Sequence, residues 1–179
     1  MHLDAQGVAS DCRLAASPHC DARPLPDDIR LVVIHNISLP AGTFGSADAE
    51  RLFLGTLDTS LRKDYAALEG LRVSAHFLIR RDGETVQFVP CSLRAWHCGP
   101  SSWCGWQRCN DFSIGIELEG CDDQPFDERQ YRRLERLLAA IRERWPNVAL
   151  AGHSEIAPGR KTDPGPHFDW PRFRPRTPA

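Results

Sequence analysis

The clearest pattern along the chain is helical and lies between residues 128 and 145. Apolar residues recur there at steps of three and four, at Tyr131, Leu134, Leu138, Ile141 and Trp145. Side chains at this spacing share one face of an α-helix, so we expect that face to be buried. Asp127 and Gln130 have the spacing of a capping box at its start, and Pro146 ends it. The Arg and Glu residues of the same stretch are interpreted as its solvated face and are given no binding role.

Two further patterns predict strands in the first half of the chain. Residues 29–36 (IRLVVIHN) form a short apolar run rich in Val and Ile, which is typical of a buried strand. The run ends at His35 and Asn36, so polar groups stand at the edge of a sheet. Further along, HFLIRR and ETVQFVP flank Asp82 and Gly83. Because Gly accepts the positive φ that a tight turn needs, these segments are predicted to form a β-hairpin.

Residues 111–120 (DFSIGIELEG) alternate between apolar and polar or small residues. Phe112, Ile114, Ile116 and Leu118 alternate with Ser113, Gly115, Glu117 and Glu119. This period predicts a strand with one apolar face, and Glu117 points away from that face. A short strand near NVALAG then leads to His153. The segment 154–170 is rich in Pro and Gly, and we expect a shaped loop without regular structure.

The remaining segments give weaker patterns. A helix is predicted after the turn-rich LPAGTFGS, with Ser46 as its cap and with apolar positions Leu52, Phe53 and Leu57. Residues 1–28 hold three prolines among scattered polar residues, so we expect them to wrap the surface before the first regular element. The basic, proline-rich residues 171–179 are interpreted as a frayed terminal tail.

Strands with helices between and after them, without a regular βαβ repeat, indicate an α+β fold. We expect a mixed central β-sheet flanked by α-helices, although the pattern does not give the strand order. The chain has 179 residues and no long linker or internal repeat. A single domain over residues 1–179 is therefore the simplest organisation.

Composition narrows the classes of function. Hydrophobic residues make up 41% and charged residues 26%, as in an ordinary soluble protein. The net charge of -2 gives no overall basic field, which argues against a nucleic-acid partner or an anionic membrane. No apolar run is long enough to span a bilayer, and the N-terminus lacks the pattern of a secretory signal. We therefore expect a cytoplasmic protein, and most simply a monomer.

The seven cysteines are an odd set without C-x-x-C spacing. This fits reduced thiols in the cytoplasm better than a disulfide framework. A structural zinc knuckle built from Cys98, Cys104, Cys109 and His97 would lack the paired thiolate spacing of such sites. We assign the cysteines no chemistry.

Two histidines stand out by their position. His35 ends a buried strand, His153 opens the loop after another strand, and Asp163 follows ten residues later in K-T-D-P-G. Two imidazoles and a carboxylate suit a catalytic zinc ion, which keeps a fourth position for water and lowers the pKa of that water to about 7. Such a site can hydrolyse amides. No H-E-x-x-H motif is present, so the ligands would come from separate strands and loops.

Five segments in order along the chain carry a resemblance to a known family. They are VIHN (33–36), SAHFLIRRDG (74–83), RAWHCG (94–99), RCNDFSIGIELEG (108–120) and GHSEIAPGRKTDPGPHFDW (152–170). These segments resemble the AmpD-type amidases of the type 2 amidase family, which is related to the peptidoglycan recognition proteins. The resemblance runs over nearly the whole chain, and its last three segments are the most specific.

The resemblance implies zinc-dependent hydrolysis of the amide between (1,6-anhydro-)N-acetylmuramic acid and L-alanine in soluble muropeptides, during peptidoglycan recycling. It makes His35, His153 and Asp163 the zinc ligands. It also makes Glu117 the general base and Lys161 the group that stabilises the oxyanion. The residue pattern agrees, because Glu117 lies on a polar strand face. Lys161 and Asp163 would also point the same way in an extended segment.

Four residues are weaker candidates for substrate binding. Asn36 adjoins a ligand, and His97 follows Trp96 in a segment that the family keeps near its cleft. Arg72 and Arg108 match positions where the family presents cations to substrate, and a guanidinium can hold a carboxylate with two hydrogen bonds.

One stretch departs from the family pattern. PSSWCGWQ, between Cys98 and Cys109, brings in Trp103 and Trp106. Their rings could stack on a sugar, but loop aromatics need no such role, and we assign them none.

Two other functions remain open. An amidase that acts on intact cell wall would use the same zinc chemistry, but the missing export signal counts against it. A non-catalytic peptidoglycan-binding module is a second alternative. Such relatives typically lose a zinc ligand, whereas here all three ligands, Glu117 and Lys161 are present.

Overall fold

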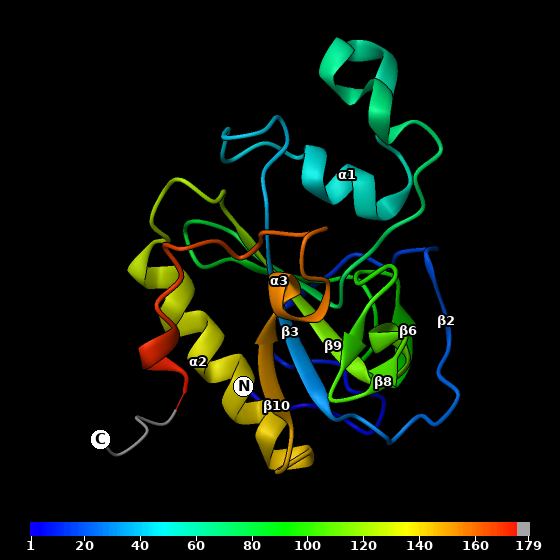
Figure 1. The fold of residues 1–179 in the computed structure, drawn as a ribbon, viewed down its shortest axis with the longest axis vertical. Helices are drawn as coiled ribbons and strands as arrows, with labels where there is room; N and C mark the ends of the chain where they lie inside the picture. The colour runs from blue at the N-terminus through cyan, green and yellow to red at the C-terminus, as the bar shows by residue number, and fades with distance from the viewer. Residues whose placement is uncertain (175–179) are drawn as a thin grey trace.

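The computed structural model describes residues 1–174. Its centre is a six-stranded sheet in the order β1-β5-β4-β9-β3-β10 (Figure 1). The strands are β1 (Arg13–Leu14), β3 (Leu31–Ile37), β4 (Phe77–Ile79), β5 (Thr85–Gln87), β9 (Ser113–Glu119) and β10 (Ala149–Gly152). Strands β4, β9, β3 and β10 run parallel to one another, whereas β5 runs antiparallel to β4. The sheet is therefore mixed, which confirms the predicted α+β class and the hairpin between β4 and β5.

Two small sheets and several helices surround this centre. The small sheets pair β2 (Cys20–Ala22) with β6 (Leu93–Ala95), and β7 (Ser102–Trp103) with β8 (Trp106–Gln107). The α-helices are α1 (Asp48–Leu54), α2 (Glu128–Arg144) and α3 (His153–Ile156), and short 3₁₀ turns cover Thr59–Leu61, Lys63–Leu68, Cys109–Asp111 and Trp170–Arg172. Figure 1 shows α2 running along the side of the sheet beside β10.

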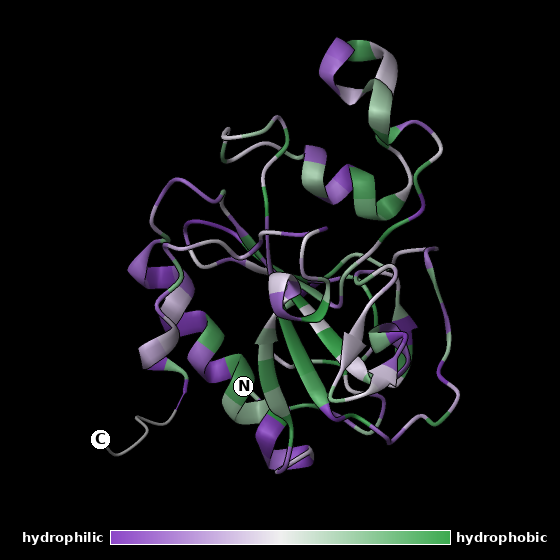
Figure 2. Ribbon diagram, viewed as in Figure 1, coloured by the Kyte–Doolittle hydropathy of each residue, from purple (hydrophilic) through white to green (hydrophobic). Residues whose placement is uncertain are grey.

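Helix α2 forms as its pattern predicts. The Asp127 carboxylate accepts a hydrogen bond from the Arg129 amide, and the Gln130 side chain accepts one from the Asp127 amide, which closes the capping box. The apolar face of α2 and the apolar face of β9 share one core cluster that includes Ile114, Ile116, Leu118, Leu134, Leu137 and Ile141. Burying an apolar side chain of this size stabilises a fold by about 1.5–3 kcal/mol. In Figure 2, purple and green bands alternate along α2, while β3 is largely green.

Helix α1 differs in detail from its prediction. It begins after Ala47, and Ser46 lies one residue earlier, where its hydroxyl accepts a hydrogen bond from the Asp48 amide at 3.2 Å. The helix ends at Gly55, whose left-handed backbone (φ 69) turns the chain away, so Leu57 lies beyond it. The sequence had predicted a longer helix, because Leu57 continues the helical spacing of the apolar residues past this glycine.

Three expectations about irregular segments are corrected. Residues 1–28 are not free of regular structure, because they contain β1 and β2, and Arg23 is only 4% exposed. The segment 154–170 is not wholly irregular, because its first residues belong to α3. Of the expected frayed tail 171–179, residues 171–174 are packed through a 3₁₀ turn and the buried Phe173, and the rest lies outside the described residues. The prolines in these segments predicted irregular structure, and the local sequence does not reveal the tertiary contacts that order them.

Over residues 1–174, no helix has both the length and the apolar character needed to cross a membrane.

Candidate active site

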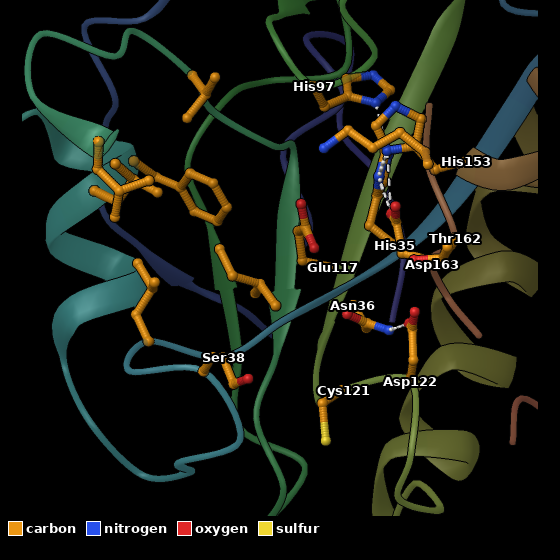
Figure 3. Close-up of a pocket in the computed structure, with 18 of the residues that line it drawn as sticks. His35, Asn36, Ser38, His97, Glu117, Cys121, Asp122, His153, Thr162 and Asp163 are labelled. Atoms are coloured by element: carbon orange, nitrogen blue, oxygen red, sulfur yellow. Dashed lines mark hydrogen bonds and ion pairs between the residues drawn. The ribbon is translucent and has the colours of Figure 1, made fainter. Parts of the chain in front are cut away.

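The ends of neighbouring parallel strands set the catalytic candidates side by side. In the pairing of β3 with β9, His35 lies opposite Glu117. In the pairing of β10 with β3, Gly152 lies opposite Ile34, so the next residue, His153, comes beside His35. The pleat of β9 turns the apolar residues toward α2 and turns Glu117 toward the other face. Figure 3 shows His35 and His153 side by side, and Glu117 lining the same pocket a little apart from them.

Asp163 completes a tight group of three donor atoms. His35 Nδ1 lies 2.9 Å from His153 Nδ1, and Asp163 Oδ2 lies 3.0 Å from the first nitrogen and 3.1 Å from the second. A hydrogen bond of 2.9 Å from the Ser154 amide to the Asp163 carbonyl holds the loop against α3. The structure therefore brings together the three residues that the sequence predicted as metal ligands.

The partners of the two imidazole rings show that lone pairs converge at this point. His153 Nε2 lies 3.0 Å from the carbonyl oxygen of Cys98, which can only accept, so that nitrogen carries the hydrogen. In the neutral ring, His153 Nδ1 then presents a lone pair to the Asp163 carboxylate and to His35. Acceptors that face one another without a donor repel, and a cation between them removes the repulsion.

The charge states of His35 and Asp163 also suit the binding of a metal cation. Burial lowers the pKa of His35 to about 4, which keeps the imidazole neutral at pH 7. Burial acts to raise the pKa of Asp163, but the adjoining His153 and His35 side chains outweigh it and hold that pKa well below its usual range. The site thus combines a neutral His35 ring with an ionised carboxylate, as metal ligation requires.

The spacing also suits zinc. Zinc–nitrogen and zinc–oxygen bonds of 2.0–2.2 Å in a tetrahedron put ligand atoms about 3.3 Å apart. The three separations in this site are 2.9, 3.0 and 3.1 Å. A small expansion of the cluster would accommodate the ion, so these residues fit a zinc ion bound by three side chains.

Glu117 lies beside this cluster without a partner. Its side chain is buried, with the residue 8% exposed, and its Oε2 atom makes no hydrogen bond within the described residues 1–174. Burial raises the pKa of Glu117 well above its ordinary value, Asp163 raises it further, and Lys161 lowers it. An unpartnered buried carboxyl is costly, and such groups are characteristic of catalytic acids and bases.

A cleft of about 560 Å³ opens over these groups. Its polar part includes His35, Asn36, His97, Glu117, Asp122, His153, Arg160, Lys161, Thr162 and Asp163. Its apolar part comes from the segment after β3, from α1 and from the segment 68–73 that precedes β4, with Leu39, Leu52, Phe53, Leu68, Leu71 and Val73. Lys161 is exposed within this cleft, and its positive charge acts on both Glu117 and His35.

The four predicted substrate-binding residues divide into two pairs. Asn36 and His97 line the cleft, whereas Arg72 and Arg108 are not among its lining residues. Arg72 borders a separate hollow beside α1. The Arg108 side chain is 71% exposed and forms an ion pair of 3.2 Å with Asp111. Substrate binding by all four therefore stays a prediction.

Sequence reasoning missed several polar residues of the cleft, among them Arg160, Asp122 and Thr162. Arg160 donates to the carbonyl oxygens of Cys98 and Pro100, so it ties the loop after β6 to the loop that carries Lys161. Asp122 accepts a hydrogen bond of 2.7 Å from Asn36. Arg160 directly precedes Lys161 in the motif segment and was open to prediction, whereas Asp122 lies in a turn without a recognisable pattern.

In the described structure the loop tryptophans are not among the residues that line the cleft, and Cys121 is the one cysteine that is. Trp103 and Trp106 lie in the β7–β8 hairpin, where the Arg30 guanidinium stacks 4.1 Å from the Trp106 ring. Within residues 1–174, no cluster that contains a cysteine brings its donor atoms together as the His35 group does. These observations agree with assigning both sets no chemistry.

Comparison with known proteins places this site in a family. The family model described as N-acetylmuramoyl-L-alanine amidase matches residues 25–166, which include His35, Glu117, His153 and Asp163. The chain belongs to the N-acetylmuramoyl-L-alanine amidase family. It is 52% identical over 176 residues to the 1,6-anhydro-N-acetylmuramyl-L-alanine amidase AmpD of Citrobacter freundii, with 97% of this chain and 94% of that protein covered.

Solved structures of amidases support the same placement. A crystal structure of a selenomethionine derivative of AmpD superimposes with a TM-score of 0.94 at 52% identity, and covers 97% of this chain and 98% of that one. The amidase AmiD from E. coli, in complex with anhydro-N-acetylmuramic acid-L-Ala-D-gamma-Glu-L-Lys, superimposes with a TM-score of 0.56 at 32% identity. It covers 94% of this chain and 60% of that one.

Proposed function

We propose that this amidase hydrolyses the bond between 1,6-anhydro-N-acetylmuramic acid and L-alanine in soluble muropeptides, with zinc held by His35, His153 and Asp163. The observation that carries this proposal is the group of converging acceptor atoms beside the unpartnered Glu117 carboxyl. The activity in the name of the 52% identical Citrobacter relative, a 1,6-anhydro-N-acetylmuramyl-L-alanine amidase, supports the choice of substrate. Nucleic acid, membrane and other subunits are not needed for this reaction.

Zinc bound by the three ligands would polarise the amide carbonyl and make a water molecule acidic enough to attack it. Glu117 is the group that moves the proton. Its side chain lines the cleft and its Oε2 atom has no hydrogen-bond partner within the described residues, so the carboxylate is available to accept a proton from the attacking water and return it to the leaving L-alanine amine. Burial raises the pKa of Glu117 well above its ordinary value, which makes the carboxyl a stronger base once it is ionised.

Lys161 supplies the positive charge that the reaction needs. As the amide carbon becomes tetrahedral, its oxygen gains negative charge, and an ammonium group in the same cleft stabilises that charge. Lys161 is exposed, and it is close enough to affect the pKa of Glu117 and that of His35. We assign it to the oxyanion.

The shape and thiol content of the protein support a soluble substrate in the cytoplasm. The cleft has a polar end at the ligands and an apolar end at α1, and its volume is that of a site for a small molecule. All seven cysteines are free, which suits a reducing compartment. Asn36, Arg72, His97 and Arg108 remain candidates for contacts with the sugar or the stem peptide.

Metal removal and readdition tests the proposed zinc chemistry. Protein stripped with a chelator and then dialysed should release no peptide from anhydromuramoyl-tripeptide, and one equivalent of zinc should restore the rate. Full activity of the stripped protein would rule out the metal mechanism.

A further inference from the structure

We propose that His97 is a positioning residue for the metal site. It accepts a hydrogen bond from His35 and thereby keeps His35 Nδ1 turned toward the cluster. The inference rests on the proposed zinc site, and it gives His97 a role other than the substrate contact that the sequence suggested.

The contact between the two rings is direct and partly buried. His35 Nε2 lies 2.9 Å from His97 Nδ1, and the ring planes meet at 89° with centroids 5.1 Å apart. His35 Nδ1, on the other side of the same ring, faces His153 and Asp163. A neutral imidazole has one N–H and one lone pair, so a hydrogen on Nε2 leaves the lone pair on Nδ1, where the metal would bind.

The far side of the His97 ring is placed to fix its tautomer. His97 Nε2 lies 3.3 Å from the hydroxyl of Ser113, which is fully buried. If Nε2 donates to that hydroxyl, Nδ1 is the acceptor that His35 requires. Both ring nitrogens of His97 are then engaged with the protein, and neither is free for substrate.

The surrounding backbone holds the ring in this orientation. The Asn110 side-chain oxygen accepts hydrogen bonds from the amides of His97 and Cys98, at 3.2 and 2.8 Å. The ring lies directly over Gly115, where an added Cβ atom would stand 2.5 Å from two ring atoms. Only glycine at this position of β9 leaves room for the imidazole between the strand and His35.

His35 and His153 are thus oriented in the same way, each by a hydrogen bond from its Nε2 atom. His153 Nε2 donates to the Cys98 carbonyl, and His35 Nε2 donates to the ring of the preceding residue, His97. One dipeptide therefore orients both imidazole ligands. Removing the outer partner of a ligating histidine typically weakens metal binding by about 10–100-fold.

Zinc affinity, measured by competition with a chromophoric chelator, tests this role. His97→Phe keeps an aromatic ring but removes the acceptor, and zinc affinity should fall by about 10–100-fold. His97→Asn places a carbonyl oxygen near the position of Nδ1 and should recover most of that loss. Gly115→Ala leaves the chemistry of His97 intact but displaces its ring, so it should resemble His97→Phe. His167→Phe, at an exposed histidine outside the cleft, is the matched control and should bind zinc normally.

The outcomes separate this inference from the proposed function. If the unsubstituted protein binds no zinc, the proposed metal site itself is wrong. If it binds zinc and His97→Phe binds equally well while KM rises, then His97 contacts substrate and the positioning role is refuted. Circular dichroism checks the fold of each variant. Should His97→Phe not fold, a zinc affinity of Gly115→Ala equal to that of His97→Asn would equally refute the inference.

Discussion

His35 and Glu117 are register partners on two neighbouring parallel strands, β3 and β9. Because side chains at paired positions of a sheet point to the same face, this pairing places the candidate base directly beside a candidate metal ligand. A slip of one residue in the register would turn one of the two side chains into the opposite layer. The extensive apolar packing of β9 against α2 prevents such a slip.

Glu117→Gln should abolish turnover while zinc remains bound. The amide has nearly the same shape as the carboxyl but cannot accept the proton of the attacking water, so kcat should fall by about 10²–10⁴-fold. Steady-state kinetics together with metal analysis would measure both effects. A variant with a near-normal rate would remove Glu117 from the mechanism.

Asp163→Ala should lose zinc and activity together. The change removes one of three converging ligand atoms and leaves the two buried imidazoles without their carboxylate. Bound zinc after dialysis and the rate of peptide release should fall in parallel. Asp27→Ala is a suitable control, because the Asp27 side chain is 88% exposed. Retention of a full equivalent of zinc by Asp163→Ala would contradict the ligand assignment.

Lys161→Met should lower kcat by about 10²–10³-fold, as the loss of one oxyanion partner does in other hydrolases. KM should change little, because the charge acts on the transition state. The chain contains one other lysine, Lys63, which is exposed and lies outside the cleft, so Lys63→Met is the matched control. A rise in KM with unchanged kcat would instead place Lys161 in ground-state binding.

Asn36→Ala should destabilise the protein as well as the site. The Asn36 amide donates to the Asp122 carboxylate at 2.7 Å and to the Pro164 carbonyl at 3.0 Å, and so ties β3 to the loop that carries Asp163. Loss of a partly buried hydrogen-bonding partner costs about 1–3 kcal/mol, which urea unfolding would detect. Unchanged stability with a raised KM would favour the substrate contact that the sequence suggested.

The metal-free protein should lose stability as the pH falls from about 6.5 to 5. Burial, the largest cause in each case, lowers the pKa of His35 to about 4 and that of His76 and His97 well below the ordinary value. In this window the unfolded chain takes up protons that the folded histidines do not bind, so folding is penalised by up to about 1.4 kcal/mol per pH unit for each group.

Glu117 changes the stability in the opposite direction. Its raised pKa lets the folded state keep a proton that the unfolded state releases, so this one group favours folding as the pH falls. The net effect of three histidines against one carboxyl is still a loss of stability at lower pH. Urea unfolding in the presence of a chelator, at several pH values, would measure it. A free energy of unfolding that stays constant from pH 6.5 to 5 would contradict the buried, neutral histidines.

The sequence predicted well those elements that a clear local pattern of apolar or turn-forming residues marks. The apolar stripe of α2, the Val-rich core of β3 and the Asp82–Gly83 turn each follow from local physics, and each is present. The order of the strands, and the pairing of His35 with Glu117, depend on contacts between segments far apart in the chain. Local patterns carry no information about such contacts.

The candidate site shows the same division. His35 and His153 were visible as polar residues at the ends of apolar strands, but their convergence on Asp163 required the resemblance to a family. The support that Gly115 and His97 give to His35 could not be predicted, because a glycine in a strand does not reveal which side chain will lie over it. Arg72 and Arg108 were expected near substrate on the motif alone, and the described structure places neither in the lining of the cleft.

The most direct test of the proposed function is mass spectrometry of the products formed from two substrates. The zinc-loaded protein would be incubated in parallel with soluble anhydromuramoyl-tripeptide and with purified intact cell wall, each with and without a chelator. We predict that the peptide is released from the soluble fragment, that the chelator stops the release, and that intact wall yields little product. Release mainly from intact wall would show a lytic amidase instead. No release from either substrate would contradict the proposed amidase activity and favour a peptidoglycan-binding module.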